Sequence, residues 1–153
     1  MDAPTTIPST STLESWTNDP ESARENLCSL LLCLAADESM ADLATEALEN
    51  CGVPSESDQE FLVQAVSNPK GDVAYWACKL IGRLGLKAND SQAALCTAML
   101  AEDKSFGVRQ QAALALGLIG SLNEASRQAL RMSAQSNDSR LSRLASQSLG
   151  NAS

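Results

Sequence analysis

The feature of this sequence that most limits its fold is a segment that recurs along the chain. In residues 108–120 the apolar side chains fall at three- and four-residue steps, as one face of a helix requires, and Gly120 is suited to close that helix. Residues 73–85 match this segment 35 residues earlier. The matched pairs are Val73 with Val108, Ala77 with Ala112, Ile81 with Leu116, Gly82 with Gly117, Leu84 with Ile119 and Gly85 with Gly120. A fixed period of this size is typical of repeat arrays.

Two weaker copies of the segment lie at residues 40–52 and 141–150, each offset by 33 residues from its neighbour. We call these glycine-ended helices the A helices. Capping-type pairs open the intervening B helices, as Ser57 and Glu60 do, because each side chain satisfies a free N–H of the other residue. The pattern therefore predicts about eight helices in hairpins, at about residues 20–36, 39–51, 58–67, 71–84, 90–101, 105–119, 122–135 and 139–150.

The composition favours an all-α protein with a short tail. Aromatic residues make up 3% of the chain, strand formers are sparse, and Ala, Leu and Ser dominate. Residues 1–18 are rich in Ser, Thr and Pro and are predicted to form a disordered tail, whereas residues 19–153 form the repeat domain. The first predicted helix is apolar nearly all round, so Leu31 and Leu32 need a cover. That cover is either the tail, through Leu13 and Trp16, or a partner protein.

Residues 103–120 resemble the HEAT-like repeat, in the short bacterial version first recognised in phycobilisome lyases. The residues that carry the resemblance are Asp103, Val108, Arg109, Ala112, Ala113, Ala115, Leu116, Gly117, Ile119 and Gly120. The match is weaker elsewhere, where Ala74 and Ser142 replace the arginine. The resemblance implies a right-handed α-solenoid of helical hairpins, with A helices on the convex layer and B helices on the concave layer. It also implies protein–protein binding as the usual role, with bilin lyases as a minority.

The net charge of −8 argues against a nucleic-acid backbone or an anionic membrane as the main partner. The charge is unevenly spread. Residues 1–68 hold 13 acidic residues and one basic residue, whereas residues 69–153 hold 6 acidic and 10 basic residues. This asymmetry has three possible interpretations. The charges form an ordinary solvated surface, the N-terminal half binds a basic partner, or copies of the protein associate head to tail.

The sequence carries little that suggests catalysis. It contains no histidine, which is the commonest general base and metal ligand, and no P-loop, dinucleotide-binding or hydrolase motif. Its five cysteines are odd in number, lack CxxC spacing and lie among apolar residues, as expected in a reducing compartment. We therefore expect a cytoplasmic protein without a signal peptide, metal or cofactor, and not an enzyme.

Candidate partner-binding residues lie where the repeat copies differ. The outward positions of the B helices are Gln64, Cys96, Thr97, Leu100, Gln128, Arg131 and Met132. Tyr75 and Trp76 occupy positions filled by glutamine in the next copy, so one of them is either an exposed anchor or packs against Lys79. The apolar first helix, with Leu31 and Leu32, is a third candidate.

These features predict a non-enzymatic protein–protein interaction or scaffold module that binds a protein or peptide on its concave B-helix surface or at its ends. Two alternatives stay open. One is a bilin lyase or tetrapyrrole-handling subunit. The other is a self-assembling structural module, a homo-oligomer joined through its terminal helices, because no helix follows the last repeat.

Overall fold

The computed structural model describes residues 7–151, and the described part is α-helical with no strand. The chain divides into two compact units, Met1–Ser55 and Glu56–Ser153. The first unit contains α1 (Thr10–Thr17), α2 (Pro20–Glu25), α3 (Leu27–Leu34) and α4 (Glu38–Asn50). The second contains α5 (Gln59–Val66), α6 (Gly71–Leu84), α7 (Gln92–Leu100), α8 (Phe106–Ile119), α9 (Glu124–Ser133) and α10 (Ser139–Asn151), with 3-10 turns at Glu56–Asp58 and Gly85–Ser91.

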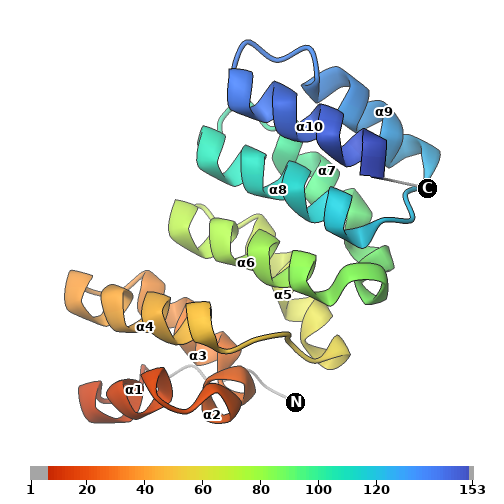
Figure 1. Cartoon of the computed structure of the whole chain (residues 1–153). Helices are drawn as coiled ribbons and strands as arrows, with labels where there is room; N and C mark the ends of the chain where they lie inside the picture. Colours follow the sequence, from red (N-terminus) through yellow and green to blue (C-terminus); the bar gives the residue numbers. More distant parts are fainter. Residues whose placement is uncertain (1–6, 152–153) are drawn as a thin grey trace. The chain divides into compact units, whose positions relative to one another are not determined.

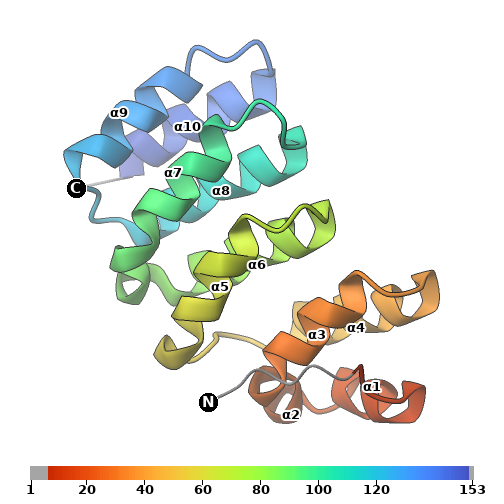
Figure 2. The same cartoon turned by 180° about the vertical axis from the view of Figure 1, so that it is seen from behind.

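The second unit is a stack of helical hairpins in two layers, as the repeat pattern predicts. The A helices α6, α8 and α10 lie side by side in one layer, and the B helices α5, α7 and α9 form the other (Figure 1). In Figure 2, which shows the molecule turned by 180°, the B helices α5, α7 and α9 lie in front. The A helices contact one another more extensively than the B helices do. The predicted all-α solenoid architecture of hairpins is confirmed for this unit.

The A helices approach one another closely where their sequences carry glycine. A Cβ atom on Gly117 of α8 would lie 2.9 Å from Ser148 Cβ and 3.1 Å from Ser148 Cα, both on α10. A Cβ atom on Gly82 of α6 would lie 3.3 Å from Ala115 Cα on α8. Real Cβ atoms do not tolerate such distances without a shift of the neighbour, so these internal glycines set the spacing of the layer.

Two further glycines end their helices, as the repeat comparison predicts. Gly85 follows α6 with a φ of 58°, and Gly120 follows α8 with a φ of 83°. These backbone conformations are costly for residues with a Cβ atom, so glycine closes each A helix and turns the chain toward the next B helix.

A buried glutamine joins successive B helices. The Gln92 side chain on α7 is 3% exposed, and its Nε2 donates a hydrogen bond of 3.1 Å to the Ser121 carbonyl. Its Oε1 accepts hydrogen bonds from the Asn123 backbone N–H at 3.0 Å and from Ser126 Oγ at 2.8 Å. Gln59, 33 residues earlier, donates in the same way to the Lys87 carbonyl at 3.3 Å. The amide thus fixes the start of one B helix against the loop that opens the next.

The first unit differs from the prediction at the tail. Residues 10–17, expected to be disordered, form helix α1, while residues 1–6 of that tail lie outside the described residues. Ser9 caps α1 by accepting a hydrogen bond of 3.2 Å from the Thr12 N–H, and Leu13 is fully buried. The polar composition of this segment predicted too little burial for folding. The helix is nevertheless stabilised by the Ser9 cap and by the burial of Leu13.

The position of the tail also corrects the predicted cover. Helix α1 folds back, but it packs against α4 and α2, with Thr10 Oγ1 donating to Met40 Sδ at 3.7 Å. Leu31 is 5% exposed, whereas Leu32 remains 38% exposed.

The first predicted helix is in fact two helices. Asn26, with φ −122° and ψ 31°, separates α2 from α3, and its side-chain amide donates a hydrogen bond of 2.7 Å to the Ser22 carbonyl. Asparagine favours such breaks because its side chain competes for backbone hydrogen bonds. The extra helix α1 and this division account for the difference from about eight helices.

Candidate functional site

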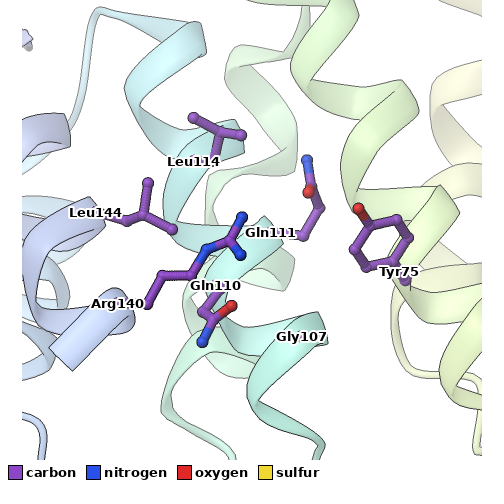
Figure 3. A pocket seen from close by; sticks show the side chains of 7 residues that line it. All are labelled: Tyr75, Gly107, Gln110, Gln111, Leu114, Arg140 and Leu144. Atoms are coloured by element: carbon purple, nitrogen blue, oxygen red, sulfur yellow. The ribbon is translucent and has the colours of Figure 1, made fainter. Parts of the chain in front are cut away.

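A hollow of about 170 Å³ opens on the A-helix layer of the second unit. Figure 3 shows Tyr75 entering from α6, Gln110, Gln111 and Leu114 from α8, and Arg140 and Leu144 from α10. Gly107, at the start of α8, completes the lining and adds no side chain that would fill the space. Three successive A helices therefore contribute to one site.

Hydrogen-bonding groups converge on this hollow without partners. The Gln111 side chain is 9% exposed, yet its amide makes no hydrogen bond within residues 7–151. In the same described part of the chain, the Arg140 guanidinium has neither an ion pair nor a hydrogen bond, and the Tyr75 hydroxyl has no hydrogen bond. No polar side-chain atom of Gln111, Tyr75 or Arg140 is both fully buried and unpaired, so these groups reach solvent in the hollow and are free to bind a ligand group.

Gln110 also lines the hollow, but its side chain already has a hydrogen-bond partner. Its Nε2 donates a hydrogen bond of 2.6 Å to Asp138 Oδ2, which also accepts from the Leu141 N–H at the start of α10. The Gln110 amide, and then the N-terminal N–H groups of α10, hold the pKa of the Asp138 carboxyl below its usual value. Through these two hydrogen bonds, Asp138 caps α10 and joins it to α8.

A second, wider hollow of about 510 Å³ lies at the edge where α7 meets α8 and α9 meets α10. Its lining includes Phe106, which is 52% exposed, and Met132, which is 56% exposed. Arg109, the arginine of the family pattern, also lines it, but its Nε donates a hydrogen bond of 2.8 Å to the Met99 carbonyl and its guanidinium lies 5.4 Å from the Phe106 ring centre. Arg109 thus closes the end of α7.

The predicted B-helix residues lie on the surface of α5, α7 and α9. Gln64, Thr97, Gln128, Arg131 and Met132 are exposed, and Cys96 and Leu100 are half-buried. Among them, the structure brings Leu100 and Met132 together in the second hollow.

Four of these B-helix residues are engaged within the protein. Arg131 Nη1 forms an ion pair of 2.8 Å with Glu124 Oε1 and donates to Gln128 Oε1 at 3.2 Å. The Cys96 thiol donates to Ser126 Oγ at 3.4 Å, and Thr97 Oγ1 donates to the Ala93 carbonyl at 3.0 Å.

The two neighbouring aromatic candidates differ in their surroundings. Trp76 is 4% exposed, and Lys79 Nζ lies 4.5 Å from its ring centre. Arg83 lies 5.7 Å from the same ring. Tyr75 is half-buried and lines the first hollow. Tyr75 is therefore the accessible aromatic side chain, and Trp76 packs under cations of its own helix.

The cysteines lie in environments that disfavour the thiolate. Burial raises the pKa of the Cys28, Cys33 and Cys96 thiols, and it raises the pKa of Cys78 to about 12. These thiols are therefore protonated at neutral pH, whereas a nucleophilic cysteine requires a lowered pKa.

The described residues contain neither a cluster of metal ligands nor a membrane-spanning helix. No group of three or more His, Cys, Asp or Glu side chains within residues 7–151 is arranged to hold a metal ion. None of the helices in that range combines the length and apolarity needed to cross a membrane.

The sequence-based candidates lie on the B helices, at Tyr75 and Trp76, and at Leu31 and Leu32. Of these, Tyr75 lines the first hollow, and the candidates did not include Gln111, Leu114, Arg140 or Leu144. The repeat alignment did contain a signal for them. Tyr75 aligns with Gln110 and Trp76 with Gln111, so the positions that vary between A helices are those around the first hollow.

Comparison with known proteins identifies the repeat. No curated protein matches the chain. A family model described as HEAT repeats matches residues 59–150, which lie within the second unit and span all of its α-helices except the last residue of α10. The chain belongs to the HEAT repeat family.

Proposed function

We propose that this protein is a protein-binding module whose partner docks on the A-helix layer of the second unit, over the first hollow. The observation that carries the proposal is the lining of that hollow: an accessible tyrosine, an unpaired arginine and two leucines from α8 and α10. Tyrosine and arginine are enriched among residues that dominate the energy of protein interfaces. HEAT repeats generally mediate protein–protein interaction, so the family agrees with this role.

The size of the hollow also favours a protein partner. Pockets that hold drug-sized molecules have volumes of about 300–1,000 Å³. The first hollow, at about 170 Å³, suits a side chain of a docked segment rather than a whole small molecule. The size of the first hollow therefore gives no support to the bilin-handling alternative at that site, and the raised thiol pKa values disfavour attachment of a bilin to these cysteines. The second hollow, at about 510 Å³, lies within this range of volumes.

The packing of the layers supports the A side as the inner surface of the second unit. A stack of hairpins bends toward the layer whose helices lie closer together, and the A helices pack more closely than the B helices. The family resemblance had led us to expect the opposite arrangement. The concave surface of a solenoid is its usual binding surface, so the closer packing favours docking over α6, α8 and α10.

Self-assembly through the last helix receives less support. Its reasons were the uneven charge and the apolar residues expected to be uncovered in the last repeat. Of these apolar residues, Leu141 and Ala145 are fully buried within the unit, and Leu144 and Leu149 are half-buried. The exposed residues of α10 include Arg143, Ser146 and Gln147, which are polar.

Site-specific photocrosslinking tests the proposed surface. A photoreactive amino acid is placed at Leu114, on the A side, or at Gln128, an exposed position of the predicted B side, in the cells that make the protein. We expect one discrete crosslinked partner from position 114 and its loss when Tyr75→Ala is added. Crosslinks from position 128 alone would instead support the B-helix surface and exclude the A-helix surface.

A further inference from the structure

The groups in the first hollow indicate the chemistry of the segment that docks there. We infer that the hollow receives a carboxylate side chain from an acidic, leucine-containing segment of the partner protein. This inference rests on the proposed function, because it assigns a chemical class to the occupant of the same surface.

The side-chain donors of the hollow match a carboxylate. The Arg140 guanidinium supplies positive charge and paired N–H donors, the Gln111 amide supplies two more N–H donors, and the Tyr75 hydroxyl supplies an O–H. Figure 3 shows the arginine and the tyrosine on opposite sides of the hollow with Gln111 between them. None of these three groups has a hydrogen-bond partner within the described residues. A carboxylate has two oxygens that each accept more than one hydrogen bond, so it can accept from the Arg140 guanidinium and from a second donor of the lining.

The charge of the layer supports an anionic occupant. Helices α6, α8 and α10 carry five basic residues (Lys79, Arg83, Arg109, Arg140 and Arg143) and one acidic residue (Asp72), a net charge of +4. Helices α5, α7 and α9 carry two basic residues (Arg127 and Arg131) and two acidic residues (Glu60 and Glu124), a net charge of zero. Arg109 lines the second hollow and the Asp138 carboxylate lies against Gln110, so the positive charge at the first hollow itself comes from Arg140. The protein as a whole is acidic, so this positive charge is local and would steer an acidic segment to the hollow.

Apolar side chains around the hollow define the rest of the segment. Leu114 is 38% exposed and Leu118 is 54% exposed, and they lie one helical turn apart on the solvent-facing side of α8. Leu144 of α10 is half-buried at the edge of the hollow. A docked segment that places apolar residues one turn from its carboxylate would cover these leucines while the acid reaches Arg140.

Two synthetic peptides test the inference. The first is an amphipathic probe with glutamate at every third or fourth position and leucine between them, and the second replaces each glutamate with glutamine. Binding of each labelled peptide to the full-length protein is followed by fluorescence anisotropy. We expect saturable binding of the glutamate peptide that weakens as salt is added, and much weaker binding of the glutamine peptide.

Variants of two arginines on one helix show where the peptide binds. Arg140→Gln should weaken binding of the glutamate peptide by about tenfold or more, because a hydrogen bond to a charged group contributes about 1.5–3 kcal/mol. Arg143→Gln is the matched control, since it removes the same charge from an exposed position of α10 outside the lining. Gln111→Met should also weaken binding, and circular dichroism confirms that each variant is folded.

The outcomes separate the inference from the proposed function. Equal binding of the two peptides, or equal losses from Arg140→Gln and Arg143→Gln, would overturn the carboxylate site. If the glutamate peptide does not bind while position 114 still crosslinks a partner, the surface stands and its acidic preference is wrong. Self-association that Arg140→Gln abolishes would make the acidic N-terminal region of a second copy the occupant and exclude a separate partner.

Discussion

At the scale of single residues, Gln92 shows how a polar side chain stabilises the repeat interior. We expect Gln92→Leu to lower the free energy of unfolding by about 2–3 kcal/mol. The loss arises because the Asn123 N–H and the Ser126 hydroxyl lose their acceptor in a buried place. Urea unfolding followed by circular dichroism measures the change. Gln64→Leu, the same substitution at an exposed position, should stay within about 0.5 kcal/mol of the wild type, and equal losses would contradict the role of Gln92.

The close approach at Gly117 makes a second prediction at this scale. Gly117→Ala places a methyl group against the Ser148 backbone, and such overpacking costs about 1–3 kcal/mol. The better helix propensity of alanine returns about 1 kcal/mol, so we expect a net loss of up to about 2 kcal/mol.

Gly150→Ala is the control for this substitution. No heavy atom lies within 4 Å of a Cβ atom built at Gly150, so alanine should be neutral or stabilising there. If Gly117→Ala were as stable as Gly150→Ala in thermal unfolding, α8 and α10 would be farther apart than described.

At the scale of helices, one position of the repeat pattern closes the end of the preceding B helix. This position holds the family arginine in α8, as Arg109, and a serine in α10, as Ser142. Arg109 Nε donates to the Met99 carbonyl at 2.8 Å, and Ser142 Oγ donates to the Ala134 carbonyl at 2.6 Å. Ser142 is the residue that weakened the sequence match of the last copy. A short hydroxyl thus takes over the backbone contact of a long guanidinium, which keeps the last hairpin closed.

Acid should destabilise the helices that begin with aspartate. Asp37 caps α4, and hydrogen bonds from the Met40 N–H and then from Ser39 hold its pKa below the usual value. Because the folded pKa is lower than the unfolded one, this stabilisation is present above about pH 4 and disappears as the pH falls through the folded value. The same sign applies to Asp19 and Asp138.

The Asp37→Asn variant makes this prediction specific. Asparagine can still cap a helix, but it does not titrate. We expect the urea midpoint of this variant to fall less than that of the wild type between pH 5 and about pH 3. Asp42→Asn, on the exposed face of the same helix, is the control and should follow the wild type. Parallel loss in Asp37→Asn and the wild type would show that the cap contributes nothing to the acid sensitivity.

The sequence predicted the elements of the second unit well because repeated copies check one another. The periodic apolar positions and terminal glycines located α6 and α8, and both glycines adopt positive φ. Helix α1 could not be found in this way, since its burial depends on Leu13 alone among polar neighbours. The candidate site was also missed, because a hollow depends on side-chain directions across three helices, which no single repeat encodes.

At the scale of the whole molecule, the two units differ in charge. Residues 1–55 hold ten acidic residues and one basic residue, a net of −9, and residues 56–153 hold nine acidic and ten basic residues, a net of +1. Together they give the total of −8. Opposed or uneven charge promotes association only where surfaces also fit, and the exposed residues of α1 and α10 include many polar side chains.

We therefore expect the isolated protein to remain a monomer. Sedimentation velocity over a wide concentration range, at low and high salt, measures this directly. A constant sedimentation coefficient under all conditions would agree with polar terminal helices. An increase with concentration at low salt that disappears at high salt would instead establish head-to-tail association through charge.

The placement of the aromatic residues gives each unit its own optical signal. The chain has two tryptophans, Trp16 on α1 in the first unit and Trp76 on α6 in the second. Trp76 is almost completely buried beside Lys79 and Arg83, whereas Trp16 is half-buried. Replacing one indole with phenylalanine leaves the other as the single tryptophan, so tryptophan fluorescence, excited where tyrosine does not absorb, can follow the melting of either unit without an added dye.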